Sequence, residues 1–207
     1  MERKTGMRYF SILVEGIPRI ELKQLNRGFV DQTVSALSAC IRAAFFLSGE
    51  IRRNTVVYIL VKREGYTFKL VGSELKYLGP DTRSIAILLM RTQRELNKLN
   101  KRREIRSRRG VYICENSDMV ETLRRIATNQ IIFPTTSGEA IEKIKLGRNV
   151  NVIIPIRYPF TISERNKLFG QGYKGVFFRD IYTVDNFIVM VHNRLDSLWS
   201  NDSDGDN

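Results

Sequence analysis

The sequence predicts an α/β protein: a largely parallel sheet with helices on both faces, extended by an antiparallel hairpin near the N-terminus. The chain has 207 residues, of which 43% are hydrophobic, which is enough to form a core. After Gly110, short apolar strands alternate with short amphipathic segments, as in parallel strands joined by helices. Before Gly110, two strand-like runs are joined by a short glycine-containing connection, which is typical of a hairpin.

The N-terminal part is predicted to contain a strand, a helix and this hairpin. Residues 8–14 form an apolar, β-rich run and give the first strand. Over 31–48, apolar residues recur at three- and four-residue steps, which indicates an amphipathic helix with Asp31 as its N-cap. The runs 56–61 and 66–71 give the two strands of the hairpin. The basic segment before the helix shows no clear pattern.

The remaining elements follow in order along the chain. A Gly-Pro-Asp turn at 79–81 precedes a long helix predicted over 82–103. Four strands are predicted beyond it, at 111–114, 130–133, 152–156 and 175–178. Helices are predicted at 118–128, 139–146 and 164–169, with N-caps Ser117, Ser137 and Ser163, and finally at 184–199. We expect residues 1–200 to form a single domain and the acidic tail 201–207 to be disordered.

The charge balance favours a polyanionic partner. Lys and Arg number 34 against 22 Asp and Glu, which gives a formal net charge of +12 at pH 7. Nucleic acid is the first class of partner that such a surplus suggests, and an acidic membrane surface is the second. The alternative is a basic protein whose charge only keeps it dispersed.

Several classes of protein are excluded by what the sequence lacks. Cys40 and Cys114 are too few for a disulfide scaffold or a four-ligand zinc site, and we predict no metal site. The N-terminus has no apolar signal core and no run is long enough to span a membrane, so we expect a cytoplasmic protein. His192 is the only histidine, and a lone helical histidine is more often a packing residue than a catalyst. No phosphate-binding loop or nucleophile elbow is present.

The densest positive charge lies between residues 91 and 109. This segment has nine Lys or Arg side chains against two acidic ones, Glu95 and Glu104. Because acids at four-residue spacing are missing, contact with an RNA phosphate backbone is favoured over a merely solvated face. The predicted RNA-binding residues are Arg91, Arg94, Lys98, Lys101, Arg102, Arg103, Arg106, Arg108 and Arg109.

Three strings carry a family resemblance. They are AFFLSGEIRR at 44–53, GSELKYLGPDTRSIA at 72–86 and VHNRLD at 191–196. They resemble the archaeal tRNA (pseudouridine(54)-N(1))-methyltransferases of the SPOUT superfamily, which read AFFLS-x-x-IRR, GSEL-(K/R)-x-x-x-PDER-x-x-A and (I/V)-H-N-x-L-D. The resemblance implies a SPOUT-type α/β knot, trefoil-knotted, and a homodimer. It also implies methyl transfer from S-adenosylmethionine to N1 of a pseudouridine in the tRNA T-loop.

In the family the cofactor is held largely by main-chain groups of three loops, which fall here at 133–138, 155–161 and 177–187. The corresponding cofactor-binding positions are Phe133, Pro155, Phe177, Tyr182 and Phe187. The family has Leu, Gly and Cys where Phe133, Pro155 and Phe187 align. Pro removes an N–H from the loop, and the two rings are large enough to fill the adenosyl volume. The alternative is therefore a non-catalytic SPOUT-fold RNA-binding protein that has lost the cofactor site.

The resemblance also suggests residues for the RNA side of the site. The family's Gly-Arg-Leu-Asp is absent in the direct alignment, which places Thr33 at its Arg and Ser35 at its Asp. A shift of four residues, about one helical turn, lets Gly-Phe-Val-Asp at 28–31 take its place without the Arg. Asp31 is therefore our candidate base, or only a helix cap. Glu74 and Arg83 match family positions, and either shape the RNA pocket or tie the hairpin to the next helix. Tyr77 and Tyr173 are candidates for stacking a splayed base, or pack within their loops.

Overall fold

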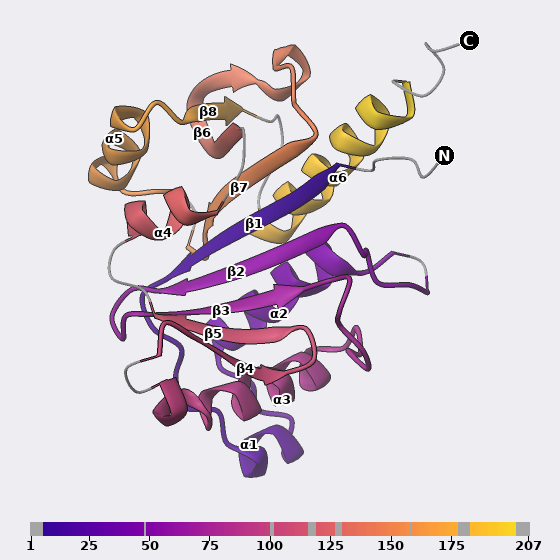
Figure 1. Cartoon of the computed structure of the whole chain (residues 1–207), viewed down its shortest axis with the longest axis vertical. Coiled ribbons are helices and arrows are strands. Elements are labelled where there is room, and N and C mark those ends of the chain that lie inside the picture. The colour runs from indigo at the N-terminus through magenta and orange to yellow at the C-terminus, as the bar shows by residue number, and fades with distance from the viewer. Residues whose placement is uncertain are drawn as a thin grey trace.

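The computed structural model describes residues 6–47, 49–99, 102–115, 119–126, 130–157, 159–177 and 183–201. It contains one eight-stranded sheet in the order β4-β5-β3-β2-β1-β7-β6-β8 (Figure 1). The strands are β1 (Met7–Val14), β2 (Thr55–Val61), β3 (Tyr66–Val71), β4 (Glu104–Arg108), β5 (Val111–Glu115), β6 (Gln130–Ala140), β7 (Asn149–Pro155) and β8 (Lys174–Phe177). The helices are α1 (Leu22–Asn26), α2 (Gln32–Phe45), α3 (Thr82–Gln93), α4 (Met119–Arg125), α5 (Ile162–Gly170) and α6 (Val184–Asn201), with 3₁₀ turns η1 (Leu96–Leu99) and η2 (Ile141–Lys143).

The sheet has a parallel half and an antiparallel half. β1 runs parallel to β2 and β7, and β6 runs parallel to β7 and β8. The pairs β2–β3, β3–β5 and β4–β5 are antiparallel. The predicted α/β class and the hairpin are both confirmed. Because their strands are parallel, β1, β2, β6, β7 and β8 all end at the same edge of the sheet.

Helices cover both faces of this sheet and create two cores of unequal size. The larger core is closed by α1, α2, α3 and α6, and the smaller one by α4 and α5. Adjacent side chains of one strand divide between them: Ile12 of β1 lies in the larger core and Leu13 in the smaller. The predicted coverage of both faces is therefore confirmed.

A buried polar cluster fixes α6 to β1 and α2. The Arg8 guanidinium donates to His192 Nδ1 at 3.0 Å and also bonds Asp196. Since an arginine has only donors, Nδ1 must accept, which leaves His192 Nε2–H to donate to the Ala44 carbonyl at 3.0 Å. Arg52 reaches the other Asp196 oxygen at 2.9 Å. His192 thus has a packing role, as its lone position on a helix suggested.

The predicted helix over 82–103 is wrong in its second half. α3 ends at Gln93, a 3₁₀ turn follows, and residues 104–108 form the edge strand β4, which the sequence did not predict. Like charges at three- and four-residue spacing in this basic segment disfavour a continuous helix. Half-buried Ile105 pairs with Ile113 of β5 instead, so the segment extends the sheet.

Other boundaries also differ from the prediction. β6 runs to Ala140, so Ser137 lies in a strand, and the helix expected over 139–146 is reduced to η2. Ile141 and Ile144 are both buried, and a single 3₁₀ turn is enough to place them on the same side. The N-cap of α5 is Thr161 rather than Ser163. The short helix α1 was not predicted, and α6 continues to Asn201, into the predicted tail.

Several predictions fall on residues outside the described ranges. Ser117 and the remainder of the tail, 202–207, are among these residues. So are residues 178–182, which connect β8 to α6 in the sequence, and the trefoil knot therefore stays a prediction.

Burial, together with the nearby guanidinium groups of Arg52 and Arg8, lowers the pKa of His192 from 6.5 to about 3. Between these values the unfolded chain binds a proton that the folded chain does not. The free energy of unfolding should therefore fall as the pH falls, by up to about 1.4 kcal/mol per pH unit. We expect His192→Gln, which does not titrate, to show a shallower dependence than the parent between about pH 6 and about pH 4 in urea unfolding. Equal slopes would show that His192 is not held neutral.

Candidate functional site

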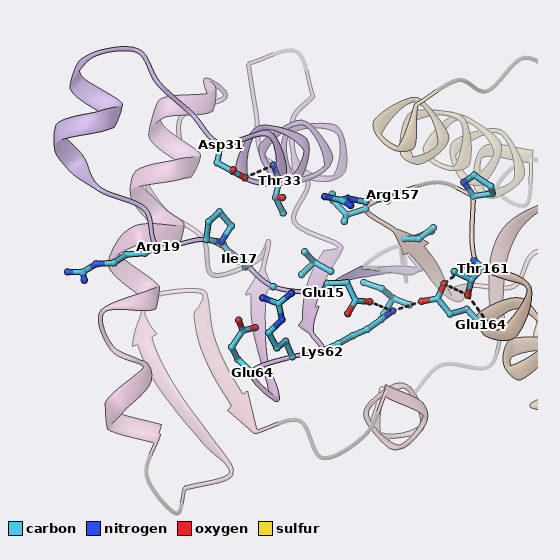
Figure 2. Close-up of a pocket in the computed structure, with 18 residues that line it drawn as sticks. Glu15, Ile17, Arg19, Asp31, Thr33, Lys62, Glu64, Arg157, Thr161 and Glu164 are labelled. Atoms are coloured by element: carbon cyan, nitrogen blue, oxygen red, sulfur yellow. Dashed lines mark hydrogen bonds and ion pairs between the residues drawn. The ribbon is translucent and has the colours of Figure 1, made fainter.

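A cavity of about 730 Å³ opens at the carboxyl ends of β1, β2 and β7 (Figure 2). Open α/β sheets bind their ligands outside the carboxyl ends of the strands, so its position is that of an active site. Its lining is balanced in charge, with Glu15, Asp31, Glu64 and Glu164 facing Arg19, Lys62, Arg63 and Arg157. Such a lining suits a polar, uncharged ligand such as a nucleobase better than a run of phosphates.

Lys62 links two elements at the floor of this cavity. Its Nζ donates to Glu15 Oε1 at 2.9 Å and to Glu164 of α5 (Figure 2). Glu164 also completes a capping box, because the Thr161 N–H donates to Glu164 Oε2 at 3.0 Å. Partial burial favours neutral Lys62, but the hydrogen bonds to Glu164 and Glu15 outweigh it and raise the pKa of Lys62. The positive charge of Lys62 is therefore paired with carboxylates of the cavity itself.

Asp31 lies on the wall of the cavity, where α2 begins. Its Oδ1 accepts the Thr33 N–H at 2.7 Å, which confirms the predicted N-cap. The Asp31 side chain is exposed, so its carboxylate can also reach a ligand in the cavity. Arg157 follows β7, and its guanidinium points toward the start of α2 (Figure 2). Within the described residues we find no ion pair or hydrogen bond of the Arg157 side chain.

The segment 133–138 lies at the same edge of the sheet, beside β8. The ladder between β6 and β8 is interrupted here, since Pro134 and Glu139 both pair with Val176. The intervening residues include Thr136 and Ser137, which are exposed. Gly138 approaches β8 so closely that an added Cβ would lie 2.6 Å from the Gly175 carbonyl carbon. This polar segment is thus pressed against β8 with its tip open to solvent.

The large side chains predicted at the cofactor positions pack in the two cores. Phe133 is fully buried and makes edge contacts with Phe160 and Phe169, with ring centroids 5.8 and 5.0 Å apart. Phe187 lies in the larger core and is 2% exposed. Pro155 ends β7 opposite Leu13 and borders the cavity, and Phe177 is half-buried at the end of β8. Tyr182 lies outside the described residues.

The basic residues predicted to bind RNA are distributed over the end of α3, the 3₁₀ turn η1, β4 and the turn after it. Arg108 is half-buried, Lys101 lies outside the described residues, and the exposed members are Arg91, Arg94, Lys98, Arg102, Arg103, Arg106 and Arg109. Two other predicted RNA-binding residues make contacts within the chain. Glu74 accepts the Tyr112 hydroxyl at 2.6 Å, and Arg83 donates to Asn26 of α1 at 2.8 Å. Glu74 thus ties the turn after β3 to β5, and Arg83 ties α3 to α1, so neither contact joins the hairpin to α3; their RNA-binding role stays a prediction.

Residues 27–199 match the family model described as "Putative SAM-dependent RNA methyltransferase". The chain belongs to this family. The tRNA (pseudouridine(54)-N(1))-methyltransferase of Methanocella arvoryzae is 26% identical over 185 residues, which cover 86% of this chain and 92% of the relative. The enzyme of the same name from Methanococcus aeolicus is 30% identical over 169 residues, covering 76% and 81%. The resemblance predicted from the three strings is confirmed.

The fold agrees with this family membership. Archaeoglobus fulgidus Nep1 bound to S-adenosylhomocysteine superposes with a TM-score of 0.59 at 12% identity, over 94% of this chain and 99% of that one. The predicted SPOUT-type α/β architecture is therefore confirmed. The S-adenosylmethionine dependence expected from the resemblance agrees with the family's description.

The first of the expected cofactor segments, 133–138, has side chains that are compatible with S-adenosylmethionine. Thr136 and Ser137 are exposed and Gly138 is half-buried, so the side chains of the first segment are small where it meets solvent. The core packing of Phe133 and Phe187 accounts for both rings without placing either on this exposed surface. A nucleoside recognised by main-chain groups is therefore compatible with the side chains found here.

Sequence reasoning did not single out Lys62 or Arg157, two charged residues of the cavity, although Arg157 lies within the predicted cofactor segment 155–161. Both follow strands, at positions where the sheet edge becomes a binding site, and that signal was available. That Lys62, Arg157 and Asp31 line the same cavity depends on the order of the strands, which could not be predicted from the sequence. Among the described residues no group of His, Cys, Asp or Glu side chains is arranged to hold a metal ion. No described helix combines the length and apolar character needed to cross a bilayer.

Replacing Phe133 by Leu tests whether its ring belongs to the core or to the cofactor volume. The variant loses edge contacts with Phe160 and Phe169, so we expect the free energy of unfolding to fall by about 1–2 kcal/mol. The Kd for S-adenosylmethionine, measured by calorimetry, should change less than about twofold, because the lost atoms face α5. A tenfold tighter Kd would place the ring in the cofactor volume instead.

Proposed function

We propose that this chain is a tRNA methyltransferase that transfers a methyl group from S-adenosylmethionine to N1 of a pseudouridine in the T-loop. The family membership and the names of the relatives support the reaction and the substrate. The observation that carries the proposal is the place of the segment after β7. It borders the cavity that contains Asp31, and the family resemblance makes it one of the three expected cofactor segments. Donor and acceptor would thus meet at one edge of the sheet.

The cavity supplies binding and a proton acceptor. Bound S-adenosylmethionine, held by the main chain of 135–138 and of the segment after β7, supplies an activated methyl group. Because the methyl donor is already activated, most of the catalysis comes from positioning the pseudouridine ring. Asp31 lies where it can accept the N1 proton, and its bond to the Thr33 N–H fixes the carboxylate. Arg157 lies where it can hold a carbonyl oxygen or a phosphate of the nucleotide.

RNA as the partner follows from the same proposal. A tRNA substrate would place the enzyme's action in the cytoplasm, and the exposed basic residues between 91 and 109 offer phosphate contacts.

A second copy of the chain is proposed to pack on α6, where Val189 and Met190 are 52% and 40% exposed. Light scattering is expected to give twice the mass of a single chain, and the mass of one chain would refute the dimer.

Calorimetric titration with S-adenosylmethionine, followed by an assay on tRNA transcripts with pseudouridine or uridine in the T-loop, tests the proposed function. We expect cofactor binding, and methylation only of the pseudouridine transcript. Tight RNA binding without heat on cofactor addition would favour the non-catalytic alternative, in which Pro155 has closed the site.

Asp31→Asn separates the proposed base from the helix cap. Asparagine caps a helix as well as aspartate does, so stability should be unchanged while kcat falls about 100-fold. Asp81→Asn is the matched control, because Asp81 caps α3 in the same way and accepts the Ser84 N–H at 2.8 Å, yet does not line the cavity. Equal activity of the two variants would remove Asp31 from the mechanism.

A further inference from the structure

A second cavity, of about 620 Å³, lies at the opposite end of the sheet from the proposed active site. It is formed by the turn after β3, by α3 and by the connection between β4 and β5. β3 is antiparallel to β2, so its carboxyl end lies beside the start of β2. The seven residues of β2 therefore separate the two cavities by about 20 Å along the strand direction.

The lining of this cavity carries positive charge that is not neutralised. It contains Lys76, Arg91, Arg108 and Arg109 and no acidic residue, whereas the first cavity has equal numbers of acids and bases. No ion pair engages these four side chains within the described ranges. Burial, with Arg91 close by, lowers the pKa of Arg108, and Glu95 only partly offsets this. An anionic ligand would relieve the crowding of guanidinium groups.

Arg108 also has a polar atom that lacks a partner. Its Nε is buried and makes no hydrogen bond to the described residues. Buried donors are normally satisfied, and an N–H left alone in a cationic cavity suits an oxygen of a phosphate. The position of Arg108 at the end of the edge strand β4 holds this donor in place.

Tyr77 is held beside these cations in a strained backbone conformation. Its φ is 59°, the only positive φ of a non-glycine residue within the described ranges, and its side chain is 99% exposed. Buried Leu75 and Leu78 anchor the turn on either side, and Arg53 donates to the Leu75 carbonyl at 2.9 Å. A positive φ at a non-glycine residue with an almost fully exposed ring, in a turn anchored on both sides, is typical of a functional residue.

We propose that this second cavity binds an unstacked RNA nucleotide, whose base stacks on Tyr77 and whose phosphate is held by Arg91, Arg108 and Arg109. Ile87 and Leu88 of α3, both half-buried, give the base an apolar surface beside the ring. Base-on-tyrosine stacking with a nearby guanidinium is a general mode of single-strand recognition. The inference rests on the proposed function in that it takes RNA as the substrate. The cavity would dock RNA about 20 Å from the reacting base and act on affinity, not on chemistry.

Two substitutions of Tyr77 test the stacking. Tyr77→Gly removes the ring and relieves the positive φ, so its melting temperature should equal or exceed that of the parent. Its Kd for the tRNA transcript should nevertheless rise about tenfold. Tyr77→Phe keeps the ring and should keep the Kd within about twofold. An RNA carrying 2-aminopurine should lose, in the glycine variant alone, the fluorescence quenching that stacking causes.

Charge variants test the phosphate contacts. Arg108→Gln with Arg109→Gln should weaken RNA binding and make its dependence on log salt shallower by about 1.5. Lys174→Gln removes an exposed charge from β8 at the other edge of the sheet, and should leave the slope unchanged. Unchanged RNA affinity in Tyr77→Gly, or equal slopes in the charge variant and its control, would overturn the proposal.

RNA binding to the second cavity and methyl transfer at the first are measured separately. RNA binding is measured without S-adenosylmethionine, so it tests the cavity even if the parent protein methylates nothing. If the parent is active, Tyr77→Gly should raise the KM for tRNA and leave kcat unchanged. A loss of kcat at saturating tRNA would contradict a docking role and leave the methyltransferase assignment standing.

Discussion

The buried cluster around Arg8 holds the C-terminal helix across the sheet, and the parallel half of the fold depends on it. Arg8 is 3% exposed and lies between His192, Asp196 and the Trp199 ring, which is 4.5 Å from its guanidinium carbon. A buried guanidinium without these partners would destabilise the fold by about 3–5 kcal/mol, so the central strand and α6 are stable only together. Since α6 follows β8 in the chain, the same contacts tie the outermost parallel strand to the middle of the sheet.

This cluster also gives the family strings a physical meaning. Arg52 comes from the first string, and His192 and Asp196 come from the third, yet all three belong to one hydrogen-bonded group. In the second string, Asp81 caps α3 and Arg83 binds Asn26. These residues of the family strings therefore maintain the fold, although Lys76 and Tyr77 of the second string line the proposed RNA cavity; the proposed methyl transfer lies at the carboxyl ends of the parallel strands.

Turns, helix caps and most helices and strands could be predicted from the sequence, whereas the order of the strands in the sheet could not. The hairpin and the Asp31 cap were predicted correctly because turn residues and helix periodicity act over a few positions. β4 was missed because the charges of its sequence hide the alternation that marks a strand. Thr161 and Glu164 form a capping box whose spacing is visible in the sequence, and Ser163 was preferred in error. The active-site cavity needs strand order, which local patterns do not contain.

The departures from the family at Phe133 and Phe187 are side-chain changes within the two cores, whereas Pro155 borders the cavity and also removes a main-chain N–H. Phe133 pushes its edge against Phe169, and the Phe169 ring in turn covers Gly175, where an added Cβ would lie 2.9 Å from its Cζ. Gly175 therefore makes room for the Phe169 ring, and Gly138 lies directly on Gly175. The position of the first cofactor segment on β8 is set by these two glycines, whose close approach tolerates no side chain. A larger ring at 133 is thus accommodated on the α5 side of the sheet, away from the exposed residues Thr136 and Ser137.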